Sequence, residues 1–185
     1  MAHTNVLDPN KALLIVIDVQ EAFRDVIPDF GGLVSRIATA VSGFQMLGVP
    51  VIATEQYPKG LGPIVEELRL VIDEENLPLE KTAFSSYRAD SFAEKLEKMG
   101  VSQVVLCGIE AHICVNQTAH DLIERGFQVH LLADCVSSRF DYNRLAGIAK
   151  MARAGVIESS TEMALFEMMG DAKHEKFKEI QALIK

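Results

Sequence analysis

Three residues carry side chains that together make an activated nucleophile: Asp18, Lys81 and Cys114. A carboxylate accepts a proton, an ammonium holds neighbouring anions, and a thiolate attacks an electrophilic carbon. Asp18 stands inside an otherwise apolar run, where an unpaired carboxylate would be costly. A purely structural ion pair explains this position as well as a catalytic role does.

Cys114 follows a glycine-led loop and stands at the start of a predicted helix. The helix dipole and the unsatisfied backbone N–H groups there favour a thiolate, and the same N–H groups can hold an oxyanion. The alternative is a core cysteine, because free cysteines are often simply buried. Cys107, inside an apolar run, fits that alternative well, and Cys135 is also interpreted as structural.

Sequence motifs for metals and nucleotides are absent. The five histidines are scattered, and no HExxH, GxGxxG, GxxxxGK[ST] or GxSxG pattern occurs. Glu110 and His112 flank one turn, but two such residues are weak evidence for a metal site. We therefore expect neither a metal ion nor a cofactor.

Short apolar runs alternate with longer amphipathic stretches along the chain. The predicted strands are Ala12–Val19, Val51–Thr54, Gln103–Cys107, Phe127–Ala133 and Val156–Ile157, with a short extended segment over Glu80–Phe84. Helices are predicted over Gly31–Leu47, Ile64–Val71, Ser91–Met99, His112–Arg125, Ser138–Ala154, Met163–Met169 and Glu175–Ile184, and Tyr57–Pro63 is predicted to be a loop. Ser91 and Ser159 each begin a capping-box pattern.

This alternation predicts an α/β fold in which helices cover both faces of a parallel sheet, a three-layer α/β/α sandwich. The length of 185 residues is typical of one domain, so we expect a single domain over residues 1–185. In such sheets the functional site lies beyond the C-terminal ends of the strands. Asp18 lies near the C-terminal end of a predicted strand, Cys114 follows another, and Lys81 lies in the short extended segment.

The composition limits the partners and the compartment. Acidic residues number 26 and basic residues 18, and the net charge of −8 argues against binding to nucleic acid or to an anionic membrane. The three cysteines form no CxxC pair, and no signal segment or membrane-spanning run is found. These features predict a soluble protein from a reducing compartment, with the cytoplasm as the default location, and leave a small molecule as the expected partner.

Four segments resemble the isochorismatase-like cysteine hydrolase superfamily and occur in the family's order. They are Leu13–Phe23 (LLIVIDVQEAF), Lys81–Tyr87 (KTAFSSY), Cys107–Cys114 (CGIEAHIC) and Ala133–Arg139 (ADCVSSR). Further segments resemble in particular the subgroup of isochorismatase-domain-containing proteins: Thr54–Pro63, His130 with Asp134–Arg139, and Lys176–Lys185.

The resemblance implies a Rossmann-like fold with a six-stranded parallel sheet and gives each of the three residues a role. Asp18 matches the general base, Lys81 matches the lysine that stabilises the thiolate and orients the base, and Cys114 matches the nucleophile. The family also has a cis peptide bond in the nucleophile loop, which here would join Ile109 and Glu110. It would aim the N–H of Glu110, with that of Cys114, at one oxyanion hole.

One departure from the family bears on metal binding. Metal-dependent nicotinamidases have an Asp-x-His cluster after the second strand, whereas this chain has Glu55-Gln56-Tyr57. The resemblance therefore implies neither zinc nor iron here, and nicotinamide is not the expected substrate. Phe23, Gln56 and Tyr57 are candidate pocket residues, with plain loop packing as the alternative.

The function expected from this resemblance is metal-independent cysteine hydrolysis of a small amide-like C–N bond through a thioester. Two alternatives stay open: an isochorismatase-type vinyl-ether hydrolase that uses Asp18 and Lys81, and a non-catalytic scaffold. The family commonly forms dimers or larger assemblies. We therefore also expect a homo-oligomer, to which the apolar C-terminal helices would contribute.

Overall fold

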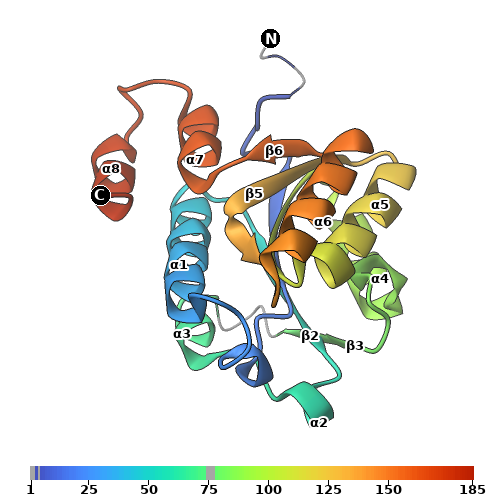
Figure 1. The fold of residues 1–185 in the computed structure, drawn as a ribbon. Helices are drawn as coiled ribbons and strands as arrows, with labels where there is room; N and C mark the ends of the chain where they lie inside the picture. Colours follow the sequence, from blue (N-terminus) through green and yellow to red (C-terminus); the bar gives the residue numbers. More distant parts are fainter. Residues whose placement is uncertain (1–2, 4, 74–77) are drawn as a thin grey trace.

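The computed structural model describes residues 3, 5–73 and 78–185 and contains one six-stranded sheet (Figure 1). All strand pairs are parallel, and the spatial order is β3-β2-β1-β4-β5-β6. The strands are β1 (Ala12–Ile17), β2 (Val51–Gln56), β3 (Leu79–Lys81), β4 (Gln103–Ile109), β5 (Gln128–Ser137) and β6 (Ile157–Ser159). The strand order reverses between β1 and β4, and the C-terminal ends of strands at such a point form a crevice.

Helices cover both faces of the sheet, which confirms the predicted three-layer α/β/α architecture (Figure 1). One face is covered by α1 (Phe30–Met46), α3 (Glu66–Arg69), α7 (Thr161–Met169) and α8 (Phe177–Leu183). The other face is covered by α4 (Asp90–Met99), α5 (Asn116–Glu124) and α6 (Asp141–Arg153). No helix in the described part of the chain is long and apolar enough to cross a membrane.

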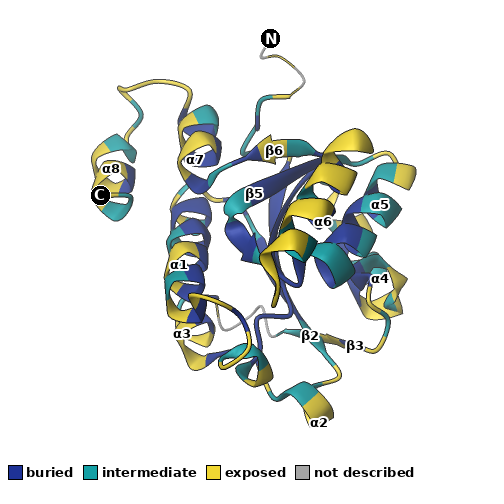
Figure 2. Cartoon of the chain, in the orientation of Figure 1, coloured by how far each residue is buried: buried dark blue, intermediate teal, exposed yellow. Residues whose placement is uncertain are grey.

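The core lies on both sides of the sheet because β1 and β4 are covered from above and below. Along β1, Leu14 and Val16 contact the cluster under α1, while Leu13, Ile15 and Ile17 contact the opposite cluster. Both central strands are buried over their whole length, whereas Figure 2 shows exposed residues along the outer helices α1, α4 and α6. A continuous apolar run is therefore the correct signature for these strands.

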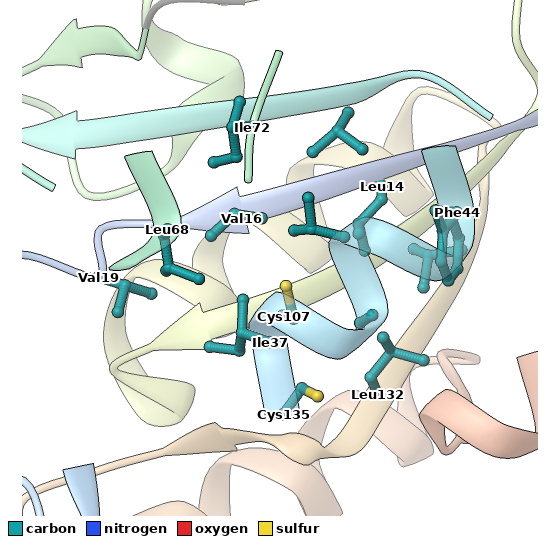
Figure 3. Close-up of a cluster of buried hydrophobic side chains, with 14 of the residues drawn as sticks. Leu14, Val16, Val19, Ile37, Phe44, Leu68, Ile72, Cys107, Leu132 and Cys135 are labelled. Atoms are coloured by element: carbon teal, nitrogen blue, oxygen red, sulfur yellow. The ribbon is translucent and has the colours of Figure 1, made fainter. Parts of the chain in front are cut away.

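Cys107 and Cys135 belong to the cluster under α1, where Figure 3 shows both sulfur atoms among apolar side chains. Burial raises the pKa of Cys107 well above its ordinary value and that of Cys135 to about 12. The Cys135 thiol also lies 3.2 Å from the Thr161 hydroxyl. Both cysteines are thus packing residues, as the sequence suggests.

Several element ends differ from the predictions. The predicted Tyr57–Pro63 loop contains a one-turn helix, α2 (Pro58–Leu61), with proline at its first position. The extended segment ends at Lys81 rather than Phe84, because the next residues turn their carbonyl groups toward the Lys81 ammonium. The Cys114 helix begins with a π-helical turn, η3 (Ala111–Val115), before α5.

Both predicted capping boxes are placed wrongly. Ser91 lies inside α4, whose N-cap is Ala89 and makes no side-chain capping bond. Ser159 ends β6, and the Ser160 hydroxyl accepts the bond from the Met163 N–H (3.3 Å) instead. Sequence spacing alone does not identify which of two neighbouring serines is the N-cap, because the N-cap position depends on where the preceding segment ends.

β5 also continues beyond the predicted end at Ala133. Its register with β4 shifts between Leu106 and Gly108, so Asp134 and Cys135 lie within an irregular part of β5 rather than after it. The Asp134 carboxylate accepts the Thr161 N–H at the start of α7 (3.0 Å). A polar residue inside the strand is therefore satisfied by the neighbouring helix, and the strand does not end there.

Candidate functional site

Asp18 directly follows β1 at the C-terminal edge of the sheet, where its backbone adopts a left-handed conformation with φ of 53°. Its N–H donates to the Thr54 carbonyl (3.2 Å), and the Thr54 hydroxyl donates to Asp18 Oδ1 (2.7 Å). Gly108 of β4 also approaches this turn, because a Cβ placed there would lie 2.1 Å from the Ile17 carbonyl oxygen. Both neighbouring strands thus fix the position of the carboxylate.

Lys81 reaches Asp18 from the last residue of β3, across β2. Its Nζ lies 2.6 Å from Asp18 Oδ2, and both side chains are only 1% exposed. The ammonium also donates to Gln56 Oε1 (2.8 Å) and to the carbonyl oxygens of Phe84 (3.0 Å) and Ala83 (3.2 Å). The buried ion pair is therefore enclosed by further hydrogen bonds, as its desolvation requires.

Cys114 lies in η3, just after β4, and is 7% exposed. The charges of Asp18 and Lys81 both act on its thiol, so the structure brings the three predicted residues into one site. Burial and the Asp18 carboxylate raise the pKa of the Cys114 thiol, and Lys81 offsets only part of this rise. Burial and Asp18 thus oppose the thiolate that a helix start would favour, and the same carboxylate is placed to accept the thiol proton.

The loop before Cys114 contains a cis peptide bond followed by a hydrogen-bonded turn. The Ile109–Glu110 peptide bond is cis, and the Glu110 carbonyl oxygen accepts the N–H groups of Ile113 (3.0 Å) and Val115 (3.3 Å). These bonds shape the turn that carries Cys114.

The buried Glu110 side chain has a partner that sequence reasoning missed. Its carboxylate accepts the Arg139 backbone N–H (2.8 Å) and Nε–H (3.1 Å). The signal for it lies in the Ala133–Arg139 segment, which places an arginine soon after β5. The Glu110–Arg139 ion pair thus connects the loop before Cys114 with the segment that leads into α6.

The three candidate pocket residues occupy different environments. Gln56 supports Lys81 and donates through its own amide to the Thr82 carbonyl (2.7 Å). Tyr57 is exposed and, with Lys81, lines an open cavity of about 580 Å³ whose lining includes neither Asp18 nor Cys114. Phe23 is partly buried and packs against the core under α1.

Two further buried polar groups lie in the segments that follow Lys81 and Cys114. The Ser86 hydroxyl and Asn116 Oδ1 have no hydrogen-bond partner among the described residues. The Ser86 N–H, in contrast, donates to the Thr118 hydroxyl of α5 (2.9 Å). Sequence reasoning missed all three residues, because serine, threonine and asparagine are too common to stand out without their contacts.

The side chains of Glu55 and His112, which lie where metal ligands could be expected, make other contacts. The Glu55 carboxylate accepts the Ile64 N–H (2.7 Å), and His112 Nδ1 lies 3.0 Å from the Ser138 hydroxyl. Across residues 3, 5–73 and 78–185, no group of three His, Cys, Asp or Glu side chains is arranged to hold a metal ion.

The fold and this site define a three-layer α/β protein with a buried carboxylate, ammonium and thiol at the crevice of its sheet. The isochorismatase domain model matches residues 12–163. The chain is 44% identical to isochorismatase domain-containing protein 2 of Danio rerio, over 100% of this chain and 92% of that protein. It therefore belongs to the isochorismatase family, a family of hydrolases, and to the subgroup of domain-containing proteins.

Other relatives extend this result. The chain is 44% identical to isochorismatase domain-containing protein 1 of Salmo salar, over 97% of this chain, but spans only 62% of that protein's length. Among solved structures, the MAR1 ribonuclease of Caenorhabditis elegans superposes with a TM-score of 0.91 at 38% identity. That superposition covers 97% of this chain and 92% of the other.

Proposed function

We propose that the protein is a metal-independent cysteine hydrolase that cleaves a small amide-like C–N bond through a thioester on Cys114. The observation that carries this proposal is a buried Asp18–Lys81 ion pair whose two charges both act on one buried thiol, that of Cys114. A nucleophile beside its own base is the usual arrangement for covalent catalysis. The Glu55–Tyr57 segment, engaged in other contacts, supports the metal-independent form.

In this mechanism Asp18 accepts the thiol proton while Cys114 Sγ attacks the amide carbonyl carbon. Because the pKa of the thiol is raised, the proton transfer accompanies the attack rather than preceding it. The N–H groups of Glu110 and Cys114 hold the oxyanion, and Lys81 keeps Asp18 oriented. Protonated Asp18 then gives its proton to the nitrogen as the C–N bond breaks and the amine leaves.

The thioester is cleaved by water in a second step. Asp18 removes a proton from the water as its oxygen attacks the acyl carbon, and the C–S bond breaks to release the acid. The sulfur recovers the proton from Asp18, so the net reaction consumes one amide and one water and yields one acid and one amine. Acid and base roles thus alternate on one carboxylate.

Release of ammonia or amine from a panel of small amides, combined with intact-mass detection of an acyl adduct, tests this mechanism. The wild type and Cys135→Ala are expected to release amine and to show an adduct on the peptide that contains Cys114. Cys114→Ala is expected to do neither, while remaining folded. Amine release by Cys114→Ala at the wild-type rate would exclude the thioester route.

The vinyl-ether alternative has one observation in its favour. Asp18 and Lys81 are fully assembled, and the neutral thiol is not required for proton transfer to an ether. Under this alternative Cys114→Ala keeps most of its activity and Asp18→Ala loses it. Inactivity of wild type toward both substrate classes, with an inert Cys114, would favour the scaffold role.

The name of the Caenorhabditis elegans relative raises RNA cleavage as a further candidate. The net charge of −8 opposes this, because binding to phosphates requires a basic surface. We expect no cleavage of a labelled single-stranded RNA at any salt concentration. Cleavage by wild type that Asp18→Asn abolishes would replace the amide proposal.

A further inference from the structure

Gln20 follows Asp18 by two residues and is fully buried. Its backbone forms an isolated antiparallel bridge with Ile64, and beside this bridge the Glu21 N–H donates to the Pro63 carbonyl (3.0 Å). A buried amide side chain is costly unless its donors and its acceptor are satisfied. The hydrogen bonds of the Gln20 side chain therefore show what this position holds in place.

The Gln20 amide holds the backbone of Gln56, the last residue of β2. Gln20 Oε1 accepts the Gln56 N–H (2.7 Å), and Nε2 donates to the carbonyl oxygens of Gln56 (3.1 Å) and Gly62 (2.6 Å). Because a backbone N–H only donates and a carbonyl only accepts, these contacts also identify which end of the Gln20 amide is the oxygen. Both peptide groups of Gln56 are thus fixed by one side chain.

This contact replaces a strand pairing that ends too early. β1 pairs with β2 only as far as Ile17 and Thr54, so the β1 ladder does not reach Gln56. Directly after Gln56 the backbone turns away, because Tyr57 has a left-handed φ of 39°. The Gln20 side chain therefore supplies the hydrogen bonds that β1 no longer provides at this end of β2.

The Gln56 side chain in turn contacts Lys81. Its Oε1 accepts one hydrogen of the ammonium (2.8 Å), and its Nε2 donates to the Thr82 carbonyl (2.7 Å). The ammonium has three hydrogens, and another of them is donated to Asp18 Oδ2 (2.6 Å). A rotation of the backbone at Gln56 would withdraw its acceptor and release the ammonium from its present direction.

The Asp18 carboxylate is held separately. Side chains two residues apart on a strand lie on the same face, so Thr54 and Gln56 both point toward the ion pair. The Thr54 hydroxyl donates to Asp18 Oδ1 (2.7 Å), within the part of β2 that pairs with β1. Movement at Gln56 would therefore displace the ammonium more than the carboxylate.

We infer that Gln20 is a positioning residue that acts through Gln56 to hold the Lys81 ammonium at the candidate site. Asp18 and Lys81 are the two charged groups that act on the Cys114 thiol, and only the ammonium favours its thiolate. Replacing Gln20 thus weakens the support of the thiolate. The inference rests on the proposed function for its catalytic consequence, a slower proton transfer, but its effect on the thiol is measurable without a substrate.

Glu55 provides the matched control for a purely structural role of Gln20. Its carboxylate accepts the Ile64 N–H (2.7 Å), so it also connects the segment after β2 to the sheet. Glu55 is adjacent to Gln56 and therefore lies on the opposite face of β2. It shares the structural role of Gln20 but has no path through Gln56 to the ammonium.

The test is the rate of Cys114 alkylation by iodoacetamide across neutral and alkaline pH, read by peptide mass spectrometry. Gln20→Met and Gln56→Met remove the amides at similar side-chain length. Each is expected to move the profile to higher pH and to lower the rate at a fixed pH about threefold or more, the equivalent of half a pKa unit. Glu55→Met is expected to leave the profile unchanged or to move it to lower pH, because it removes a negative charge. Circular dichroism confirms folding, and Gln20→Asn, which keeps a shorter amide, replaces Gln20→Met if that variant does not fold.

The double variant Gln20→Met/Gln56→Met separates a shared path from two independent effects. Since Gln20 acts through Gln56, the double variant is expected to react no more slowly than the slower single variant. A wild-type profile for folded Gln20 variants, equal shifts in Gln20→Met and Glu55→Met, or fully additive effects in the double variant would overturn the inference. Alkylation requires no turnover, so failure of the amide panel and failure of this inference are separate results.

Discussion

The ammonium of Lys81 is the only charge that contacts the Asp18 carboxylate among the ion pairs of the described residues. Lys81→Met leaves that carboxylate buried without its partner, so we expect a loss of about 3–5 kcal/mol in the free energy of unfolding. Urea unfolding at pH 7 measures it, with Lys178→Met on exposed α8 as the control.

The double variant Asp18→Asn/Lys81→Met removes both charges and is expected to recover much of this loss. Equal stability of Lys81→Met and Lys178→Met would show that the Asp18 charge does not depend on Lys81.

The Cys114 thiol is expected to react slowly at neutral pH. Burial and Asp18 raise its pKa, so the thiolate fraction, and with it the rate of alkylation by iodoacetamide, increases only at alkaline pH. Asp18→Asn removes the raising charge and leaves Lys81, so the whole rate profile is expected to move to lower pH. Peptide mass spectrometry reads the rate at each cysteine.

Cys135 is an internal control for this experiment, because burial raises its pKa to about 12 and it packs in the core. A fast, pH-independent reaction of wild-type Cys114 between pH 6 and 8 would show instead that this thiol is already ionised at neutral pH.

At the scale of single elements, sequence and structure agree best where both faces of a strand are covered. β1 and β4 are buried throughout and begin where predicted, although β1 ends at Ile17 rather than Val19 and β4 at Ile109 rather than Cys107. Agreement is poorest where a tertiary contact sets the boundary. β5 continues through Asp134 because α7 satisfies its carboxylate, and the extended segment ends at Lys81 because the ammonium attracts the following carbonyl groups.

The close approach of β4 to β1 gives a prediction at this scale. Gly108 has φ of +113°, and a Cβ there would meet the Ile17 backbone, which cannot move without displacing Asp18. Gly108→Ala is therefore expected to destabilise the protein by about 3 kcal/mol or more and to slow any Asp18-dependent reaction.

Gly31→Ala in α1 is the matched control, because nothing lies within 4 Å of its added methyl group. Thermal unfolding compares the two variants. Equal melting temperatures would mean that β4 and β1 are farther apart than the structure places them.

At the scale of the whole molecule, the candidate site depends on strand order. Asp18 and Cys114 were predictable because each follows an apolar run, and any parallel sheet gathers such residues at one edge. The contacts of Thr54 with Asp18 and of Gln56 with Lys81 were not predictable, because they require β2 to lie between β1 and β3 in one particular register. Strand order is a long-range property that local periodicity does not encode.

One buried histidine contributes to the pH dependence of the stability of the fold. His130 in β5 is fully buried, and neither ring nitrogen has a hydrogen-bond partner among the described residues. Burial lowers its pKa from 6.5 to about 4. Between pH 6.5 and pH 4 His130 is protonated in the unfolded chain but not in the native state. The free energy of unfolding therefore decreases as the pH falls through this range.

Replacing His130 with leucine removes this proton and is expected to flatten that part of the stability curve by up to about 3 kcal/mol. The readout is the difference in urea-unfolding free energy between pH 7 and pH 4.5, which separates titration from any change in packing. His3→Asn, at an exposed histidine, is expected to leave the wild-type slope unchanged. A His130→Leu slope equal to that of wild type would mean that the native protein accepts the proton, and that a partner for the ring exists which the structure does not place there.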